Sequence, residues 1–158
     1  MTDTIPILTR RRIEAEFARG VFEEMKAALG DAAAKRILTA AVVKMARATA
    51  ARMAQEAPGG TPSLDSFRAI QHLWTAEDAL RTEVLASTPT AFDFNVTRCR
   101  YAEMYREMGL AELGAILSCN RDGAFCEGYD SRLRLTRTQT LMGGASHCDF
   151  RYRVEPEG

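Results

Sequence analysis

The chain has 158 residues, 46% of them hydrophobic, so it can bury the core of one ordinary domain without stabilising cross-links. Its 21 lysines and arginines balance its 21 aspartates and glutamates, and this zero net charge argues against nucleic acid as a partner. The polar N-terminus does not resemble a secretory signal, and no apolar run approaches the roughly 20 residues of a spanning helix, so we expect a cytoplasmic protein without membrane contact.

The first predicted element is an amphipathic helix. Over residues 9–29, apolar side chains recur every four positions with charged residues between them, which is the pattern of a one-sided helix. Arg10, Arg11 and Arg12 fall at its first turn, where we expect them to be solvated. The apolar stripe consists of Ile13, Phe17, Val21, Met25 and Leu29.

A second helix is expected directly after the first. Gly30 can adopt the left-handed conformation that ends a helix, and Asp31 can cap the next helix, which stops before Pro58. The two helices predict a helical hairpin over residues 1–57. A third helix, led in by Ser63, is expected to pack on this pair.

The period of the apolar pattern then changes from about four to two. Alternation over residues 80–84 and again over 92–96, with a turn at 88–90 between them, predicts a β-hairpin. Two short helices broken at Gly109 follow, and residues 122–128 favour a further helical turn.

The C-terminal part predicts a second strand pair. Apolar residues at 133 and 135 start it, and residues 148–154 complete it across a tight turn at Gly143-Gly144. The order of elements indicates an α+β fold, in which N-terminal helices are followed by hairpin, helices and hairpin. These form an antiparallel sheet with helices packed on at least one face. We therefore expect a single hydrolase-like domain over residues 1–158, with residues 63–158 contributing a helix, the sheet and its inserted helices.

Chemically active side chains concentrate in residues 119–151, which hold three of the four cysteines, one histidine and several carboxylates. A thiolate near acids and an imidazole is what nucleophilic or metal-assisted hydrolysis requires. The spacing of the cysteines matches no zinc-finger pattern, and in a reducing cytoplasm we expect free thiols or metal ligands rather than disulfides.

Three stretches carry a resemblance to a known family. They read RRRIEAEFARGVFEEM from Arg10, FDFNVTRCRYAEMYREMGLAELGAILSCNRDGAFCEG from Phe92, and LRLTRTQTLMGGASHCDFRY from Leu133. With these stretches the chain resembles the L-2-amino-thiazoline-4-carboxylic acid hydrolase family. The resemblance implies hydrolytic opening of a cyclic thiazoline amino acid to a carbamoyl-cysteine. The matching positions are Cys99, Cys119, Asp122, Glu127, Thr138, Thr140, His147, Cys148 and Asp149.

This reaction requires groups that activate a poor electrophile. The ring carbon lies between two nitrogens and a sulfur, so it must be kept protonated and clamped, and Asp122 and Glu127 are the candidate carboxylates. Cys119 is the preferred nucleophile, provided that its pKa is lowered by a neighbouring group. His147 is the preferred acid and base, and Cys148 is a further catalytic candidate.

Substrate binding calls for a different set. An arginine suits the substrate carboxylate because its planar fork matches two oxygens, and Arg137 or Arg151 is the expected anchor. The predicted substrate-binding residues are Glu127, Arg137, Thr138, Asp149, Arg151 and Cys99.

Three alternatives stay open at this point. Free cysteine is often a core residue, which is the better interpretation of Cys126, whereas Cys148 fits a structural and a functional role equally. We expect no metal or cofactor, but Cys99, Cys119, His147 and Cys148 could converge to bind zinc or iron. The chain could also be a non-catalytic small-ligand-binding or sensor domain with a cysteine-lined pocket. In each case the expected partner is a small molecule, and a homodimer is left open.

Overall fold

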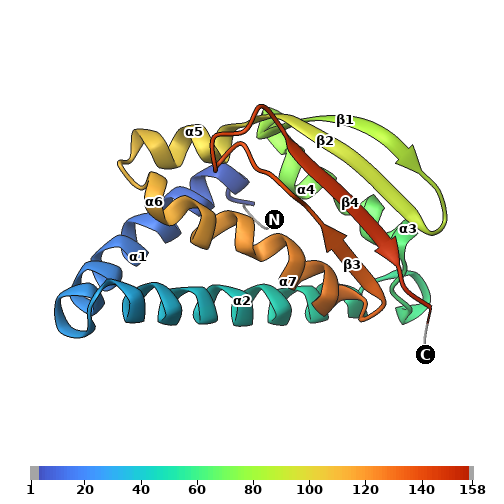
Figure 1. Cartoon of the computed structure of the whole chain (residues 1–158). Helices are drawn as coiled ribbons and strands as arrows, with labels where there is room; N and C mark the ends of the chain where they lie inside the picture. The colour runs from blue at the N-terminus through green and yellow to red at the C-terminus, as the bar shows by residue number, and fades with distance from the viewer. Residues whose placement is uncertain (1–3, 157–158) are drawn as a thin grey trace.

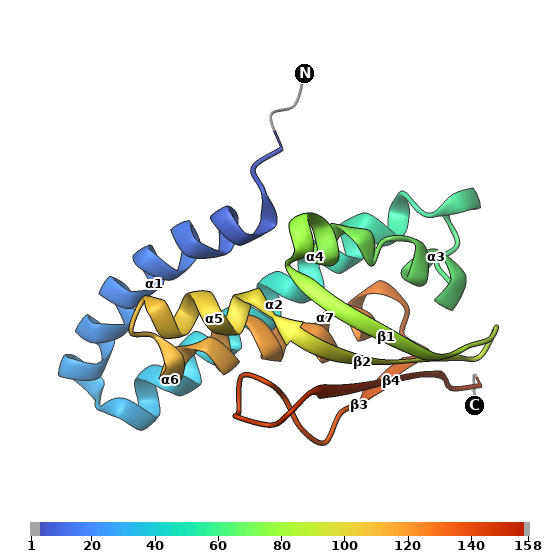
Figure 2. The same ribbon diagram turned by 90° about the horizontal axis from the view of Figure 1, so that it is seen from above.

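The computed structural model describes residues 4–156 and consists of long N-terminal helices followed by a sheet with helices packed against it (Figure 1). The first two helices are α1 (Ile7–Leu29) and α2 (Asp31–Gln55). Between them, Gly30 has a φ of 90°, a conformation that glycine adopts without strain. The helices diverge from this turn as the two arms of a V (Figure 2). The two predicted helices and the glycine that separates them are confirmed.

Short helical segments connect α2 to the sheet. The predicted third helix is present but broken, since α3 (Leu64–Ala69) ends before α4 (His72–Thr75) begins. Ser63 caps α3, as expected, in a capping box with Ser66. Single 3-10 turns lie on either side, η1 (Pro58–Gly60) and η2 (Ala76–Asp78).

The sheet has four strands, β1 (Leu80–Ser87), β2 (Ala91–Cys99), β3 (Leu133–Thr136) and β4 (Cys148–Val154). Their order is β1-β2-β4-β3, and all neighbouring pairs are antiparallel. Both predicted strand pairs are confirmed, and β2 pairs with β4 at the centre of the sheet, with Phe94 opposite Phe150.

A helical segment joins the two strand pairs. It comprises α5 (Arg100–Glu107), α6 (Ala111–Gly114), a π-helical stretch η3 (Ala115–Cys119) and α7 (Asn120–Tyr129). The predicted break at Gly109 is confirmed, and this residue has a φ of 70°. The helical turn expected near residue 122 is instead the full helix α7, which lies between α2 and the sheet (Figure 1).

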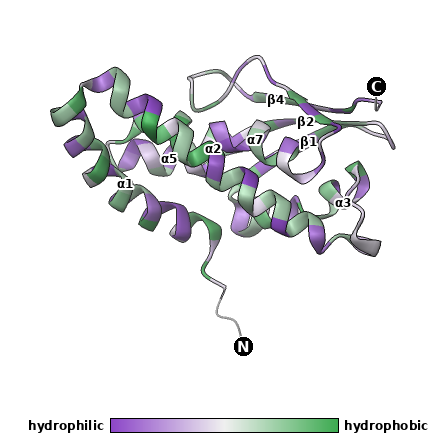
Figure 3. Ribbon diagram, turned by 90° about the horizontal axis from the view of Figure 1, so that it is seen from below, coloured by the Kyte–Doolittle hydropathy of each residue, from purple (hydrophilic) through white to green (hydrophobic). Residues whose placement is uncertain are grey.

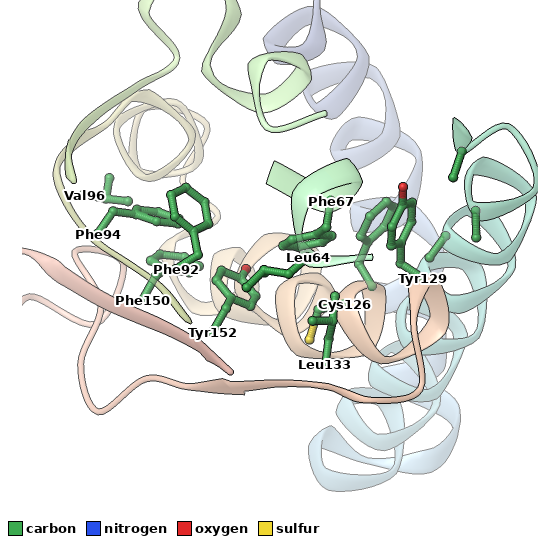
Figure 4. Close-up of a cluster of buried hydrophobic side chains, with 14 of the residues drawn as sticks. Leu64, Phe67, Phe92, Phe94, Val96, Cys126, Tyr129, Leu133, Phe150 and Tyr152 are labelled. Atoms are coloured by element: carbon green, nitrogen blue, oxygen red, sulfur yellow. The ribbon is translucent and has the colours of Figure 1, made fainter. Parts of the chain in front are cut away.

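The main core lies between α7, α3 and the inner face of the sheet. Aromatic side chains from β2 and β4 meet Phe67 of α3 there, with the Phe67 and Tyr152 ring centroids 5.0 Å apart (Figure 4). Cys126 of α7 is fully buried in this cluster, which confirms its interpretation as a core residue. The opposite face of the sheet carries ion pairs such as Arg153 with Asp93. The predicted α+β fold, with helices on at least one face of an antiparallel sheet, is confirmed.

Two expectations about local structure are wrong. Gly143-Gly144 does not form a tight hairpin turn, because β3 and β4 are joined by a longer loop over residues 137–147. Arg11 is not a solvated residue, since only 12% of its side chain is exposed.

Most of the apolar stripe of α1 faces solvent, although the helix is amphipathic as predicted, and of its members only Met25 packs against the core. Phe17 is 77% exposed, whereas Ala15 and Phe22, on another side of the helix, are buried. Figure 3 shows apolar and polar stretches alternating along α1. No helix within residues 4–156 has the length and apolar character needed to cross a membrane.

Candidate functional site

The candidate site forms where the sheet meets the start of α7. Cys119 is the last residue of η3, in which the backbone follows a π-helical path, and the Asn120 amide donates to the Ala115 carbonyl. Such π-helical turns are rare and occur frequently at functional sites. Asp122 lies in the first turn of α7, one helical turn beyond Cys119.

Arg137 binds this turn from the first position after β3. Its Nη1 donates to Asp122 Oδ2 at 2.6 Å, and its Nη2 donates to the Cys119 carbonyl at 3.1 Å. The guanidinium also lies over the Phe150 ring, 5.1 Å from its centroid. One arginine therefore fixes both candidate residues against the inner face of the sheet.

The environment makes the charged form of Asp122 less favourable than that of a carboxyl in water. Burial raises the pKa of this carboxyl, and the attraction of Arg137 opposes the effect without cancelling it. The side chain nevertheless keeps 36% of its surface exposed, so small molecules can reach it. A carboxyl with a raised pKa keeps its proton to a higher pH than a free carboxyl does, which is a property of groups that transfer protons in catalysis.

Three of the four thiols belong to the same neighbourhood, but none is activated in the ligand-free protein. Burial, and then the charge of Asp122, raises the pKa of Cys119 to about 12. Burial also raises the pKa of Cys99 to about 11, although the Ala102 amide donates to its sulfur. Burial raises the pKa of Cys148 as well. The lowered pKa that a resting nucleophile needs is therefore absent, and Cys119 requires a proton acceptor to react.

Helix α1 contributes charged residues that the sequence analysis did not select. Arg11 Nη1 donates to both carboxylate oxygens of Glu14, at 3.1 and 2.8 Å. Arg121 of α7 donates to the same carboxylate at 3.3 Å. Tyr101 and Tyr105 of α5 are buried beside this group. RRRIE lies in a family-like stretch, but nothing in its spacing shows which arginine faces inward.

The structure places several other predicted site residues on the opposite face of the sheet or in the loop before β4. Asp149 accepts hydrogen bonds from the backbone amides of Thr138 and Gln139, at 2.9 and 3.0 Å, and so anchors that loop. His147 contacts Gln139 and Ser146. Arg151 donates to Asn95 and to backbone carbonyls of the sheet.

No hydrogen bond or ion pair within the described residues links His147 to Cys119 or Asp122. Glu127 points in a third direction, where it pairs with Arg47 of α2 at 3.5 Å. The structure thus brings together Cys99, Cys119, Asp122, Arg137 and Cys148, whereas Glu127, Thr138, His147, Asp149 and Arg151 form their hydrogen bonds and ion pairs with other partners.

A hollow of about 440 Å³ lies over the loop before β4. Arg137 lines it and also belongs to the inner group, so the hollow adjoins the Asp122 pair. Its volume is within the range of small-molecule sites. The other lining residues are Thr138, Gln139, Thr140, Gly143 and Ala145.

The candidate metal ligands do not form a recognisable site in the described part of the chain. Within residues 4–156, no three histidine, cysteine, aspartate or glutamate side chains are arranged to hold a metal ion. All four cysteines lie in that range as free thiols. The absence of any cofactor stays a prediction.

Comparison with solved structures shows the class of fold. The phenol-responsive sensory domain of the transcription activator PoxR, crystallised with phenol, superposes with a TM-score of 0.55 at 13% identity, over 85% of this chain and 71% of that one. Subunit 3 of a trafficking protein particle complex from Naegleria fowleri, covalently bound to palmitic acid, gives a TM-score of 0.54 at 10% identity, over 94% and 96%. At these identities the likeness shows a shared α+β fold.

The family is shown by sequence. The model of the L-2-amino-thiazoline-4-carboxylic acid hydrolase family matches residues 10–152, nearly the whole chain, so the protein belongs to that family. No curated protein matches the chain significantly.

Proposed function

We propose that this protein is a hydrolase that opens a small cyclic amidine or thiazoline carboxylic acid, in the manner of L-2-amino-thiazoline-4-carboxylate to carbamoyl-L-cysteine. The observation that carries the proposal is the Arg137 to Asp122 pair, which also binds the Cys119 carbonyl. Asp122 lies one helical turn from Cys119, in a protein whose family is named for this reaction, and both facts support the proposal. Membership of a family does not by itself establish a reaction, so the proposal rests on the geometry of the site.

The chemistry can be divided into two balanced steps. In the first, the Cys119 sulfur adds to the ring carbon between the two nitrogens, and Asp122 accepts the thiol proton. The bond from that carbon to the ring sulfur breaks, and Asp122 returns the proton to the departing sulfur. In the second step, water adds to the carbon now bound to Cys119, and one water proton goes to the nitrogen of the C=N bond. The bond from this carbon to the Cys119 sulfur then breaks, the hydroxyl proton goes to that sulfur, and the carbonyl of the carbamoyl group forms.

Asp122 is better placed than His147 for the proton transfers. Asp122 accepts a hydrogen bond from Arg137, which also donates to the Cys119 carbonyl, whereas His147 forms hydrogen bonds with loop residues. The raised pKa of Asp122 suits a group that must gain and lose a proton in each cycle. His147 therefore has no step in this scheme.

The test is the rate of ring opening, followed as carbamoyl-cysteine by mass spectrometry. We expect Asp122→Asn to lower kcat by about 100-fold or more, because acid and base catalysis contributes that much in typical enzymes. Asp93→Asn is the matched control, since Asp93 also pairs with an arginine but on the outer face of the sheet. Wild-type protein without turnover, or full activity of Asp122→Asn, would refute the proposal.

The role of Cys119 is tested separately. If its sulfur attacks the ring, Cys119→Ser loses turnover and the wild type accumulates an adduct on the peptide that contains residue 119. Near-normal turnover by Cys119→Ser would leave Asp122 to activate water directly, and would remove the thiol from the mechanism.

A ligand-binding module without turnover is the second candidate. Two observations favour it, the likeness of the fold to a sensory domain and the raised pKa values of the thiols. Incubation with thiazoline and imidazoline carboxylic acids separates the two functions. A module gives saturable binding without ring-opened product, whereas a hydrolase gives product.

A further inference from the structure

The inner site contains more positive than negative side chains. Arg137 is matched by Asp122, but Arg11 and Arg121 share the single carboxylate of Glu14. Arg11 and Arg121 are 12% and 19% exposed, so water screens their charges poorly. The group therefore has a surplus positive charge in a largely covered position.

Several hydrogen-bond donors of these two arginines are unused. Arg11 uses Nη1 for Glu14, and Arg121 uses Nε for the Leu117 carbonyl at 2.6 Å and Nη2 for Glu14. Within residues 4–156, Arg11 Nε and Nη2 and Arg121 Nη1 donate no hydrogen bond. None of these unused donors is among the buried side-chain atoms that lack a partner, so water reaches them, and an anion can replace that water with a charge-assisted hydrogen bond.

The unused donors belong to the same interior as the candidate catalytic residues. The charges of both Arg11 and Arg121 act on Asp122 and on Tyr105. Burial raises the pKa of Tyr105 to about 12 against the pull of the two arginines, so its phenol stays neutral. Burial, and then repulsion by Arg11, lowers the pKa of Arg121, which agrees with two cations held close together.

We propose that Arg11 and Arg121 form the anion-binding part of the site and hold the carboxylate of the ring substrate. This proposal rests on the proposed function, because the ring substrate is the one proposed there. It replaces the two arginines expected from the sequence, because Arg137 is engaged by Asp122 and Arg151 by the outer face of the sheet. In this proposal, α1 selects the substrate through Arg11, whereas the candidate catalytic carboxyl, Asp122, lies on α7.

The test compares two ligands that differ only in the carboxylate. L-2-amino-thiazoline-4-carboxylate and 2-amino-2-thiazoline, which is the same ring without the acid group, are titrated calorimetrically against each protein. We expect the wild type to prefer the acid by about tenfold or more. Arg11→Gln and Arg121→Gln should weaken binding of the acid by a similar factor and leave binding of the plain ring unchanged.

Arg12→Gln is the matched control, because Arg12 neighbours Arg11 on α1 but is 46% exposed and lies 3.8 Å from Glu107. It should retain the wild-type preference. If Arg11→Gln does not fold, as judged by circular dichroism, Arg11→Lys keeps the charge and loses the planar fork, and it should show a reduced preference. Equal binding of the two ligands by the wild type, or an unchanged preference in both arginine variants, overturns the proposal.

Ring opening measured in the same samples separates this proposal from the proposed function. Arginine-dependent binding of the acid without product would refute the hydrolase and leave the anion site standing. Product formation with an unchanged preference in Arg11→Gln and Arg121→Gln would refute the anion site alone. Failure of the wild type to bind either compound would overturn both.

Discussion

Cys119 lies in the candidate site, but its thiol is unreactive in the ligand-free protein. Its pKa of about 12 implies roughly a thousandfold less thiolate at pH 8 than for an ordinary cysteine. We predict that iodoacetamide alkylates Cys119 slowly, at a rate that still rises between pH 7 and pH 10. Peptide mass spectrometry measures this, with guanidinium-unfolded protein as the fast reference. A rate that levels off below pH 8 would show an activated thiolate and contradict this description of the site.

Asp122 should make stability depend on pH. Because burial raises its pKa in the folded protein, the folded state keeps a proton that the unfolded state releases near pH 4. Stability contributed by this proton is complete below pH 4 and is lost as pH rises through the raised folded pKa. We predict that Asp122→Asn removes this loss, so the variant gains stability relative to wild type as pH increases. Urea unfolding at pH 5 and pH 8 tests this, and an equal difference at both values would contradict it.

Among the candidate site residues, the sequence indicated the chemistry better than the location. Cys119, Asp122 and Arg137 were all predicted site residues, and Arg137 binds both the Asp122 carboxylate and the Cys119 carbonyl. His147 and Asp149 were also predicted site residues, but His147 lies in the loop before β4, and Asp149 lies on the face of β4 opposite Phe150, because successive side chains of a strand alternate between faces. Arg11 was missed because a run of three arginines at a helix start does not show which of them faces inward.

At the scale of elements, the approach of α7 to α2 depends on one glycine. A Cβ at Gly128 would lie 2.9 Å from Arg47 Cα and 3.0 Å from the Arg47 carbonyl oxygen, so the backbone of α2 would have to move. We predict that Gly128→Ala destabilises the fold by about 1 to 3 kcal/mol. Thermal unfolding measures the effect.

Gly123→Ala is the matched control on the same helix, where a Cβ meets nothing within 4 Å. There we expect unchanged or slightly higher stability, since alanine favours helix by up to about 1 kcal/mol over glycine. Equal melting temperatures for the two variants would argue against close packing of α7 on α2.

The strands were easier to predict than the helices between them. Alternation of apolar and polar residues identified both strand pairs, because a sheet with one covered face imposes that period. Helix α7 was underestimated because its start, Asn120 to Gly123, has the composition of a turn, and burial against α2 overrides that local preference. The spacing of apolar residues in α1 predicted a helix but not which side packs inward. Apolar residues that recur every four positions occur both on core-facing helices and on helices that bind a partner.

For the whole molecule, the exposed stripe of α1 suggests where a second copy could bind. Ile13, Phe17 and Val21 are 54%, 77% and 42% exposed, and contiguous apolar surface of this kind marks interaction sites. The outer face of the sheet is instead covered with ion pairs such as Arg153 with Asp93. We therefore predict that the chain forms a homodimer through this stripe of α1.

Sedimentation analysis tests that prediction. The wild type should sediment as a dimer at micromolar concentration, and Phe17→Glu should sediment as a monomer with an unchanged melting temperature. A monomeric wild type would remove the homodimer, and a dimer that persists in Phe17→Glu would place its interface elsewhere.

A crystal structure of Asp122→Asn with L-2-amino-thiazoline-4-carboxylate bound would show the site directly. We predict that the ring lies beside Cys119 and residue 122, with its carboxylate on Arg11 and Arg121. A ring bound in the loop hollow against Thr138 and Gly143, with Cys119 untouched, would contradict this prediction.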